Sequence, residues 1–503
     1  MGVIQRQVFK SNLLSYVGIA IGALTNVFLF PKDPGLKGYV DTLLKSALLL
    51  APVLMLGTTT VMIHFSPYVK GGFKRANAKL LARMIVVGGG SLLALALVNF
   101  FFRDTVFELL LARGISVEKL QTSSWIVIGL LVAIMGTNIV NTALSIYQRI
   151  AVPVLFNNIF LKVALPVIFL LALYGYLERS AFAWALVGIY LLSLLGVVAY
   201  GMRIGALNLE WGKLEVEGRS AREMYTVAGF SIIGTLGSVL AVYIDTLTVN
   251  FYLGDVPTGY YGFAAFAVSL IMVPHKAMTS IANPIITREF KDGNVNALAA
   301  LYRDSARTLL VMGSFILAGL VVCLPTLYQV TPKMQQFAVG YSATIVLGLG
   351  VLTDQMTSIN GQLISFSRYF RMGTIFVLIM GVINVALNYV FIGRLGYGLL
   401  GAGMATAISL LIYNALKSVF VYLKFRMHPF STGMVFTLAV SAFAVLTGRL
   451  LPDVGIVLVD LLIKGGWVTG CFAGYVLGTN YAPVLKSAIL GKIAGAINHL
   501  PRK

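Results

Sequence analysis

The sequence has few charged residues and few cysteines. Only 11% of its 503 residues are charged, whereas about 25% are charged in ordinary soluble domains. A soluble globular domain of this length does not need so little charge, so that class of protein is disfavoured. The two cysteines, Cys323 and Cys471, both fall in apolar stretches. We therefore expect free packing thiols, with no disulfide framework and no cysteine metal site.

The motifs of nucleotide and metal chemistry are also missing. The phosphate-binding pattern Gly-x-x-x-x-Gly-Lys-Ser/Thr does not occur, which argues against an ATP-driven pump. The four histidines have no partner at metal-ligand spacing. Gly396 to Gly401 formally matches a dinucleotide fingerprint, but no soluble strand precedes it, so we interpret it as a turn. The sequence predicts no enzyme, no metal and no cofactor.

Long apolar runs are what the sequence has in abundance. Hydrophobic residues make up 58% of the chain, and they form runs of about 20 residues, the length that crosses a bilayer as a helix. The predicted spans are 12–30, 40–65, 84–102, 124–147, 153–175, 182–202, 225–251, 259–282, 308–327, 338–364, 372–392, 399–423, 432–450 and 455–479. The chain is thus predicted to be an all-α polytopic membrane protein with about 14 transmembrane helices.

The second half of the chain repeats the first. Landmark residues recur at offsets of 219 to 222 positions: Tyr39 and Tyr260, Pro52 and Pro274, Asn141 and Asn360, Arg149 and Arg368. Six spans per copy is an even number, so both copies cross the membrane in the same direction, with a pseudo-twofold axis along its normal. Repeats of membrane spans are typical of transporters whose substrate path lies between the copies.

This repeat predicts four segments. Residues 1–204 form a six-helix bundle, 205–224 a cytoplasmic linker, and 225–428 the second six-helix bundle. Residues 429–503 hold the extra helices 13 and 14 and a basic cytoplasmic tail.

The net charge of +20 is concentrated in the loops between even-numbered spans and the next odd one, and at the termini. The clearest example is the run Lys70, Lys74, Arg75, Lys79 and Arg83. The positive-inside rule therefore places both termini in the cytoplasm. Because the charge follows the membrane edges, we expect membrane lipid headgroups as partners and no nucleic acid.

Ionisable residues inside the spans are the first functional candidates, since each costs at least ~2.5–3.5 kcal/mol at mid-membrane. The basic residues are candidates for a cavity that holds a phosphate-bearing substrate: Lys45, Lys162, Lys276, Arg149 and Arg368. The acidic candidates for ion coupling or gating are Asp245 and Asp354. The structural alternative is pairing between helices and, for the two arginines, anchoring at the inner membrane edge.

Asparagines and i,i+4 charge pairs are further candidates. Asn138 and Asn141 share one helix face, as do Asn384 and Asn388, and either pair could serve hydrogen bonding between helices or sugar recognition. Two charge pairs are expected to neutralise themselves locally: Asp41 with Lys45, and Asp460 with Lys464. Four prolines fall within spans and can bend them: Pro52, Pro166, Pro274 and Pro325.

Three stretches resemble polysaccharide-exporting flippases. The stretch from Asn384 to Thr406 is similar to their segment N-x-x-x-I-x-x-x-G-x-x-G-A-A-x-A-T. The stretch from Tyr243 through Asp245 to Tyr261 resembles their seventh span and outer loop, and Ser365 to Arg371 resembles their loop after span 10. The chain is identified as a member of the multidrug/oligosaccharidyl-lipid/polysaccharide exporter superfamily, in its O-antigen and polysaccharide flippase branch.

The resemblance implies two bundles that rock between inward-open and outward-open states. It also implies a substrate, an undecaprenyl-pyrophosphate-linked oligosaccharide that is moved from the inner to the outer leaflet of the bacterial inner membrane. Polysaccharide polymerase or assembly proteins are candidate partners, and an ion gradient or the membrane potential is the expected driving force. The extra helices 13 and 14 are similar in number to those of O-antigen and lipid II flippases, and because they form a groove for the lipid tail in lipid II flippases, the same role is a hypothesis here.

Three alternatives remain open from the sequence. A multidrug or organic cation antiporter would share the twin-bundle fold, but typically with twelve spans and an acidic, aromatic cavity. A lipid II flippase would be expected to carry a cluster of cavity arginines, whereas Lys45 and Lys276 stand in the corresponding spans. A non-transporting scaffold of a polysaccharide assembly complex is the third alternative.

Overall fold

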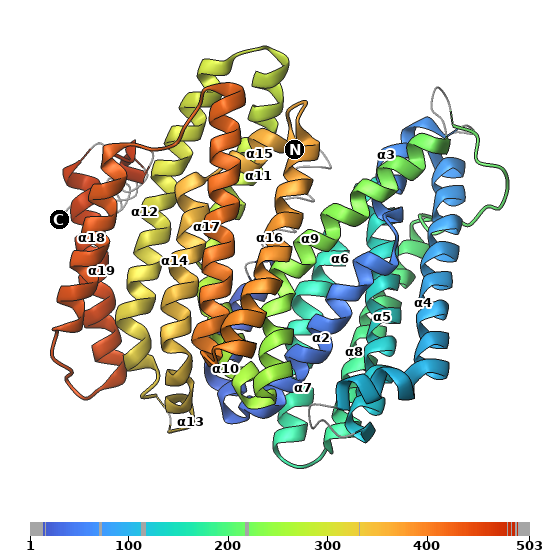
Figure 1. Ribbon diagram of the computed structural model, residues 1–503, viewed down its shortest axis with the longest axis horizontal. Coiled ribbons are helices and arrows are strands. Elements are labelled where there is room, and N and C mark those ends of the chain that lie inside the picture. The colour runs from blue at the N-terminus through green and yellow to red at the C-terminus, as the bar shows by residue number, and fades with distance from the viewer. Residues whose placement is uncertain are drawn as a thin grey trace, which may run out of the picture. The chain divides into compact units, whose positions relative to one another are not determined.

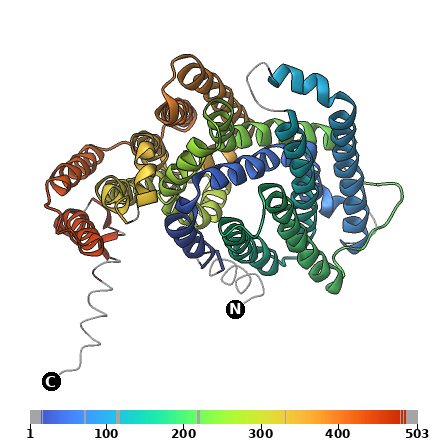
Figure 2. The ribbon, with the colours of Figure 1, turned by 90° about the horizontal axis from the view of Figure 1, so that it is seen from below.

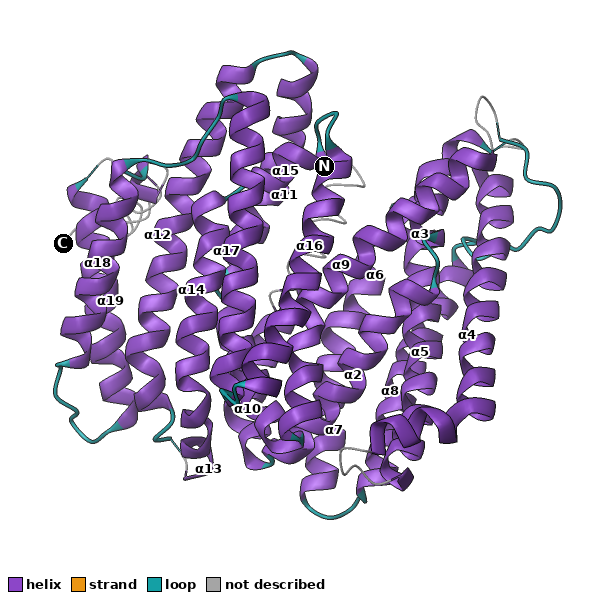
Figure 3. Cartoon of the chain, in the orientation of Figure 1, coloured by secondary structure: helices purple, strands orange, loops and turns teal. Residues whose placement is uncertain are grey.

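The computed structural model describes residues 14–15, 17–69, 73–111, 117–216, 221–330, 332–479, 481–483, 485–487 and 490. Within these ranges the chain is built of helices (Figure 3), and its β-type pairing is a single isolated bridge between Val69 and Val216. The basic residues at the two ends of the chain, and Lys70, lie outside the described residues. The contacts divide the chain into two compact units, residues 1–259 and 260–503.

The first unit runs through α9 to the start of α10 (Figure 1). Its elements are η1 Thr25–Leu29, η2 Phe30–Lys32, α2 Pro34–Leu54, α3 Thr58–Phe65, η3 Ser66–Tyr68, α4 Phe73–Leu111, α5 Val117–Ile146, α6 Ala151–Val154, η4 Leu155–Phe160, α7 Leu161–Leu173, α8 Arg179–Arg203 and α9 Ala221–Leu253, followed by α10 Asp255–Ser269, which belongs to this unit only up to Gly259. The Asp33 carboxylate accepts a hydrogen bond from Leu36 N at 2.9 Å and so caps α2, with Pro34 in the first turn where its missing N–H costs nothing.

The second unit contains the rest of the chain. Its elements are α11 Met272–Lys291, α12 Val295–Leu327, α13 Pro332–Gln335, η5 Gln336–Gly340, α14 Tyr341–Thr357, α15 Asn360–Ser365, α16 Phe370–Asn388, η6 Tyr389–Arg394, α17 Gly398–Phe425, α18 Thr432–Arg449 and α19 Val457–Gly478. The last two helices lie side by side against α12 (Figure 2, red and yellow). Their shared core is apolar and includes Val322, Ala444 and Val468.

The number of spans agrees with the prediction of about 14. Among the residues that the structure describes, eleven helices are long and apolar enough to cross a membrane, or up to 13 if each bent helix pair counts as one span, and a shorter apolar helix covers Val17–Lys32. These helices correspond in order to the predicted spans. The chain is therefore a multi-pass helical membrane protein.

Two spans are broken, and they are corresponding spans of the two copies. The second span is α2 and α3, bent by 51°, and the eighth is α10 and α11, bent by 45°. At the first break Leu56 and Gly57 take left-handed φ values of 48° and 72°, which glycine adopts at little cost. At the second, the Pro274 ring would clash in a continuous helix with the carbonyl four residues earlier, at Leu270, and the helix is interrupted there. Interrupted helices in corresponding spans are typical of transporter binding sites.

The packing boundary at 259/260 lies beyond the linker that the sequence predicts at 205–224. The reason is that α9 packs along α2 within the first unit. The division into six spans per copy follows sequence similarity rather than packing, and it stays a prediction.

The repeated Gly-Tyr tracts bring backbones into contact within the first unit. A Cβ on Gly38 would lie 1.7 Å from the Asp255 carbonyl oxygen, and a Cβ on Gly259 would lie 2.1 Å from the Pro34 carbonyl oxygen. The Arg179 guanidinium pairs with the Asp255 carboxylate beside this crossing. Only glycine allows α2 and α10 to approach so closely.

We predict that Gly38→Ala lowers the melting temperature of the purified protein, because overpacking against a backbone carbonyl costs about 1–3 kcal/mol. The matched control is Gly89→Ala in α4, where an added Cβ meets nothing within 4 Å. That control should melt at the same temperature as the unaltered protein or slightly higher, since alanine favours helix by about 1 kcal/mol. Equal melting temperatures for the two variants would contradict the glycine crossing.

Candidate functional site

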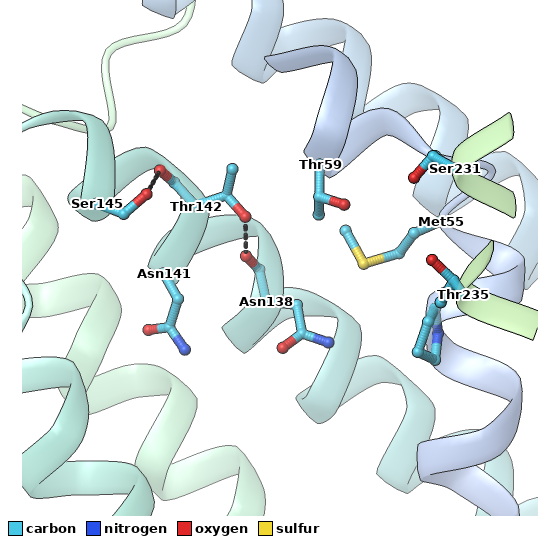
Figure 4. Close-up of a pocket in the computed structure, with 10 residues that line it drawn as sticks. Met55, Thr59, Asn138, Asn141, Thr142, Ser145, Ser231 and Thr235 are labelled. Atoms are coloured by element: carbon cyan, nitrogen blue, oxygen red, sulfur yellow. Dashed lines mark hydrogen bonds between the residues drawn. The ribbon is translucent and has the colours of Figure 1, made fainter. Parts of the chain in front are cut away.

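A polar cavity of about 360 Å³ lies beside the break between α2 and α3, within the first unit (Figure 4). Its lining comes from α2, the break, α3, α5 and α9: Pro52, Met55, Gly57, Thr59, Asn138, Asn141, Thr142, Ser145, Ser231 and Thr235. These side chains are hydroxyls, amides and small apolar groups, and none of them is charged or aromatic. We call this cavity the polar pocket.

The spacing of the lining residues explains why they gather there. Four of them recur on α5 at i, i+3, i+4 and i+7, which is one face of a helix. Within that face Thr142 Oγ1 donates to Asn138 O at 2.7 Å and Ser145 Oγ donates to Thr142 O at 2.8 Å, as Figure 4 shows. Both hydroxyl oxygens keep their lone pairs to accept hydrogen bonds.

Asn141 is the side chain with an unmet hydrogen bond. Its Oδ1 atom is buried and has no hydrogen-bond partner among the described residues. Buried polar groups are nearly always hydrogen-bonded, so a ligand group or water is the natural partner. Neutral donors and acceptors in such a pocket suit a ligand that is rich in hydroxyl groups.

The structure places Lys45 and Asp245 in a buried polar cluster of the first unit. Lys45 Nζ donates to Thr246 Oγ1 on α9 at 2.6 Å, and the charges of Asp41, Lys37 and Asp245 act on it. Asp245 is only 5% exposed. The direct ion pair of Asp41 is with Lys37 one turn earlier, at 2.5 Å, and not with Lys45 as the sequence predicted, although the Asp41 charge acts on Lys45 too.

The other two basic candidates of the first unit lie elsewhere. Lys162 is half-buried on α7, and its Nζ lies 3.9 Å from the position of a Cβ on Gly22. Arg149 is exposed in the turn after α5, the location expected of an anchor at a membrane edge. Lys162 therefore packs against the first apolar helix, Val17–Lys32, and lies apart from Lys45, which contacts α9.

In the second unit, Asp354 is the centre of a polar cluster between α11, α14 and α17. Asn414 Nδ2 donates to Asp354 Oδ1 at 2.7 Å, and the Asp354 charge acts on both Lys417 and His275. Lys417 is 6% exposed, and its Nζ lies 3.8 Å from the Tyr413 ring centroid. His275 Nδ1 is buried without a hydrogen-bond partner in the described ranges. The cluster thus places a carboxylate, an amine and an imidazole close together inside apolar membrane-spanning helices.

The sequence reasoning missed Lys417. The residue lies inside the predicted span 399–423, with Tyr413 and Asn414 at i−4 and i−3. Those spacings place all three side chains on one helix face, and that was the available signal.

The remaining candidates of the second unit are not gathered at one place. Lys276 is exposed on α11. Arg368 is exposed in the turn between α15 and α16, with its guanidinium 4.9 Å from the Tyr369 ring centroid. Asn388 is fully buried and donates to Asn384 O and Oδ1 at 2.9 and 3.0 Å. Asn384 Nδ2 in turn donates to Thr406 Oγ1 on α17 at 3.1 Å, so this asparagine pair serves hydrogen bonding between α16 and α17.

The charge pair predicted for Asp460 and Lys464 is wrong. Lys464 Nζ instead pairs with Asp453 Oδ1 at 2.6 Å and donates to Thr326 Oγ1 at 2.8 Å. Asp460 accepts the backbone N–H of Val454 at 2.6 Å. Both side chains hold the loop before α19 and serve the structure of the last two helices.

We predict that Asp354→Asn and Lys417→Met are coupled. Each single change leaves a partner charge without its counterpart in an apolar surrounding, so the double variant should lose less unfolding free energy than the two changes summed. The expected coupling is about 0.5–3 kcal/mol, measured by unfolding in detergent. Lys424→Met, an exposed lysine on the same helix, serves as the control and should be additive with Asp354→Asn. Additive effects for Lys417→Met would show that the two groups do not interact.

No family model matches the chain. A search of curated proteins finds the uncharacterized membrane protein EpsK of Bacillus subtilis, 25% identical over 238 residues. That match covers 45% of this chain and 45% of that protein, so the chain spans about half the length of the curated relative.

Solved structures match over most of the chain. The lipid II flippase MurJ in an inward closed conformation aligns with a TM-score of 0.71 at 14% identity, covering 93% of this chain and 98% of MurJ. An inward-facing multidrug resistance transporter of the MATE family aligns with a TM-score of 0.61 at 13% identity, covering 82% and 94%. The chain is therefore a multi-pass membrane protein with the fold of transporters of the multidrug/oligosaccharidyl-lipid/polysaccharide exporter superfamily, as its sequence resemblance predicted.

Proposed function

We propose that this protein flips an undecaprenyl-pyrophosphate-linked oligosaccharide from the inner to the outer leaflet of the bacterial cytoplasmic membrane, for surface polysaccharide synthesis. The polar pocket carries the proposal, because amides and hydroxyls beside a broken span offer sugar hydroxyls both donors and acceptors. The fold of a lipid II flippase supports a lipid-linked cargo. Alternating access within this fold would move the head group while the tail stays in lipid, with both termini in the cytoplasm.

The basic candidates would hold the pyrophosphate. Lys162 and Lys276 are assigned first, with Lys45, Arg149 and Arg368 as further positive charges along the path. Lysine and arginine bind phosphate through charge and several donors.

The clusters around Asp245 and Asp354 are proposed as the coupling or gating sites. Each holds a carboxylate beside a buried amine, and the net charge of such a cluster changes when the carboxylate gains a proton or an ion. An ion gradient or the membrane potential would then drive the cycle.

The lining of the polar pocket separates the proposal from a multidrug antiporter. An organic cation needs carboxylates or aromatic faces, and the ten lining residues include neither. A lipid II flippase remains the alternative with similar cargo, and transport of purified lipid II by the same preparation distinguishes it.

We predict that Asn141→Leu and Thr235→Ala slow flipping of the lipid-linked oligosaccharide in proteoliposomes by about fivefold each, since one lost hydrogen bond is worth about 1 kcal/mol. The matched control is Thr248→Ala, also on α9, whose hydroxyl donates to its own helix at Ile244 O, 2.8 Å away. Flipping at the unaltered rate by both pocket variants would rule out the polar pocket as the sugar site.

We predict that Lys162→Ala and Lys276→Ala abolish flipping without loss of protein from the membrane, because the pyrophosphate loses its counter-charges. Lys424→Ala is the control for removal of one exposed positive charge. Full transport by both lysine variants would refute the cationic assignment and leave the polar pocket untouched.

A further inference from the structure

A second cavity in the first unit, of about 900 Å³, has a different chemistry. It lies among α3, α4, α9 and residues 205–216, the described part of the connection between α8 and α9. Most of its wall is apolar, with Met62, Leu80, Met84, Val87 and Ile232 among the lining side chains. Its size is within the roughly 300–1,000 Å³ of small-molecule sites. We call it the edge cavity.

Two basic side chains line the apolar wall. Lys79 and Arg83 stand one turn apart on α4 and both line the edge cavity. Lys79 Nζ donates to Lys213 O at 3.4 Å, and Arg83 Nη2 donates to Gly212 O at 2.8 Å. Carbonyl oxygens are neutral, so these bonds leave both positive charges in place.

The acidic side chain that lines the edge cavity is already engaged. The carboxylate of Glu210 pairs with Arg75, Nε to Oε1, at 3.2 Å. The charge that Lys79 and Arg83 present to a ligand is therefore positive, and the side chains around these two residues are mostly apolar. A ligand that matches both features has an anionic head and a long apolar chain.

The edge cavity lies at the expected headgroup level. The apolar span Lys74–Phe101 begins beside it, and the basic tract of α4 marks this end as cytoplasmic by the positive-inside rule. Trp211 and Tyr225 line it and are 67% and 78% exposed. Exposed tryptophan and tyrosine are typical of the membrane–water interface. Lipids of the inner leaflet thus have direct access.

We propose that the edge cavity binds an anionic phospholipid of the cytoplasmic leaflet, with its phosphate on Lys79 and Arg83 and an acyl chain among the apolar side chains of α3, α4 and α9. Basic pockets between spans on the cytoplasmic side characteristically take anionic headgroups. Lys79 and Arg83 already join α4 to the segment 205–216 by donating to its carbonyl oxygens. A phosphate bound to the same two side chains would strengthen this contact. The site is separate from the polar pocket and does not depend on the proposed substrate.

The test is lipid binding to the full-length protein in detergent, followed by native mass spectrometry and by melting temperature. Phosphatidylglycerol should bind and raise the melting temperature, whereas phosphatidylcholine with the same acyl chains should bind at least tenfold more weakly. Lys79→Gln with Arg83→Gln should abolish this preference. The control pair Lys424→Gln with Arg426→Gln, at the exposed end of α17, should keep it.

A second variant keeps the charges and fills the space. Gly229 lines the edge cavity, and a Cβ there meets nothing within 4 Å, so Gly229→Phe should fold and lose phosphatidylglycerol binding. Equal binding of the two phospholipids, or an unchanged preference in both the double and the Gly229→Phe variants, would overturn the proposal. Undecaprenyl phosphate that displaces phosphatidylglycerol at equimolar concentration would overturn it too, in favour of a carrier-lipid site.

Discussion

A polar group in the hydrocarbon layer must find a partner inside the protein, because an unsatisfied one costs several kcal/mol. This constraint organises both units of the chain. Lys37 with Asp41, Asp354 with Asn414, and Lys464 with Asp453 all satisfy it by pairing. In the polar pocket Asn141 keeps a buried oxygen without a partner among the described residues, as His275 Nδ1 does in the cluster around Asp354. Pairing contributes to stability in the first cases, and an unpaired buried group in the lining of a cavity is a candidate contact for a ligand.

The broken spans connect this constraint to function. In a continuous helix the backbone N–H and C=O groups bond to one another. At a break some of these groups have no partner within the helix, and the span bends. The breaks occur in the second and eighth spans, and the first of them borders the polar pocket. The Gly38 and Gly259 crossing lies at the other end of the same two spans, where they begin. The alternating access that we propose would require these bent and closely crossed spans to move.

The sequence predicted the fold more fully than the site. Span length and hydropathy are local properties, so the spans and the repeat could be read directly, and the i,i+3 spacing of Asn138 and Asn141 placed both on one face. The choice of ionic partner is not local. Asp41 has a lysine one turn away on each side, and rotamers and neighbouring helices select Lys37. Lys464 selects a loop residue, Asp453. The shared helix face of Tyr413, Asn414 and Lys417 could be read from the sequence, but only the approach of α14 and α11 brings Asp354 and His275 to it.

The most direct test of the account is transport by the unaltered protein in sealed proteoliposomes offered three cargoes separately: an undecaprenyl-pyrophosphate-linked oligosaccharide, lipid II, and a fluorescent organic cation. The appearance of each cargo on the opposite side is followed over time against protein-free vesicles. The account predicts that the lipid-linked oligosaccharide crosses and that the cation does not. Cation transport without any movement of the oligosaccharide would contradict it.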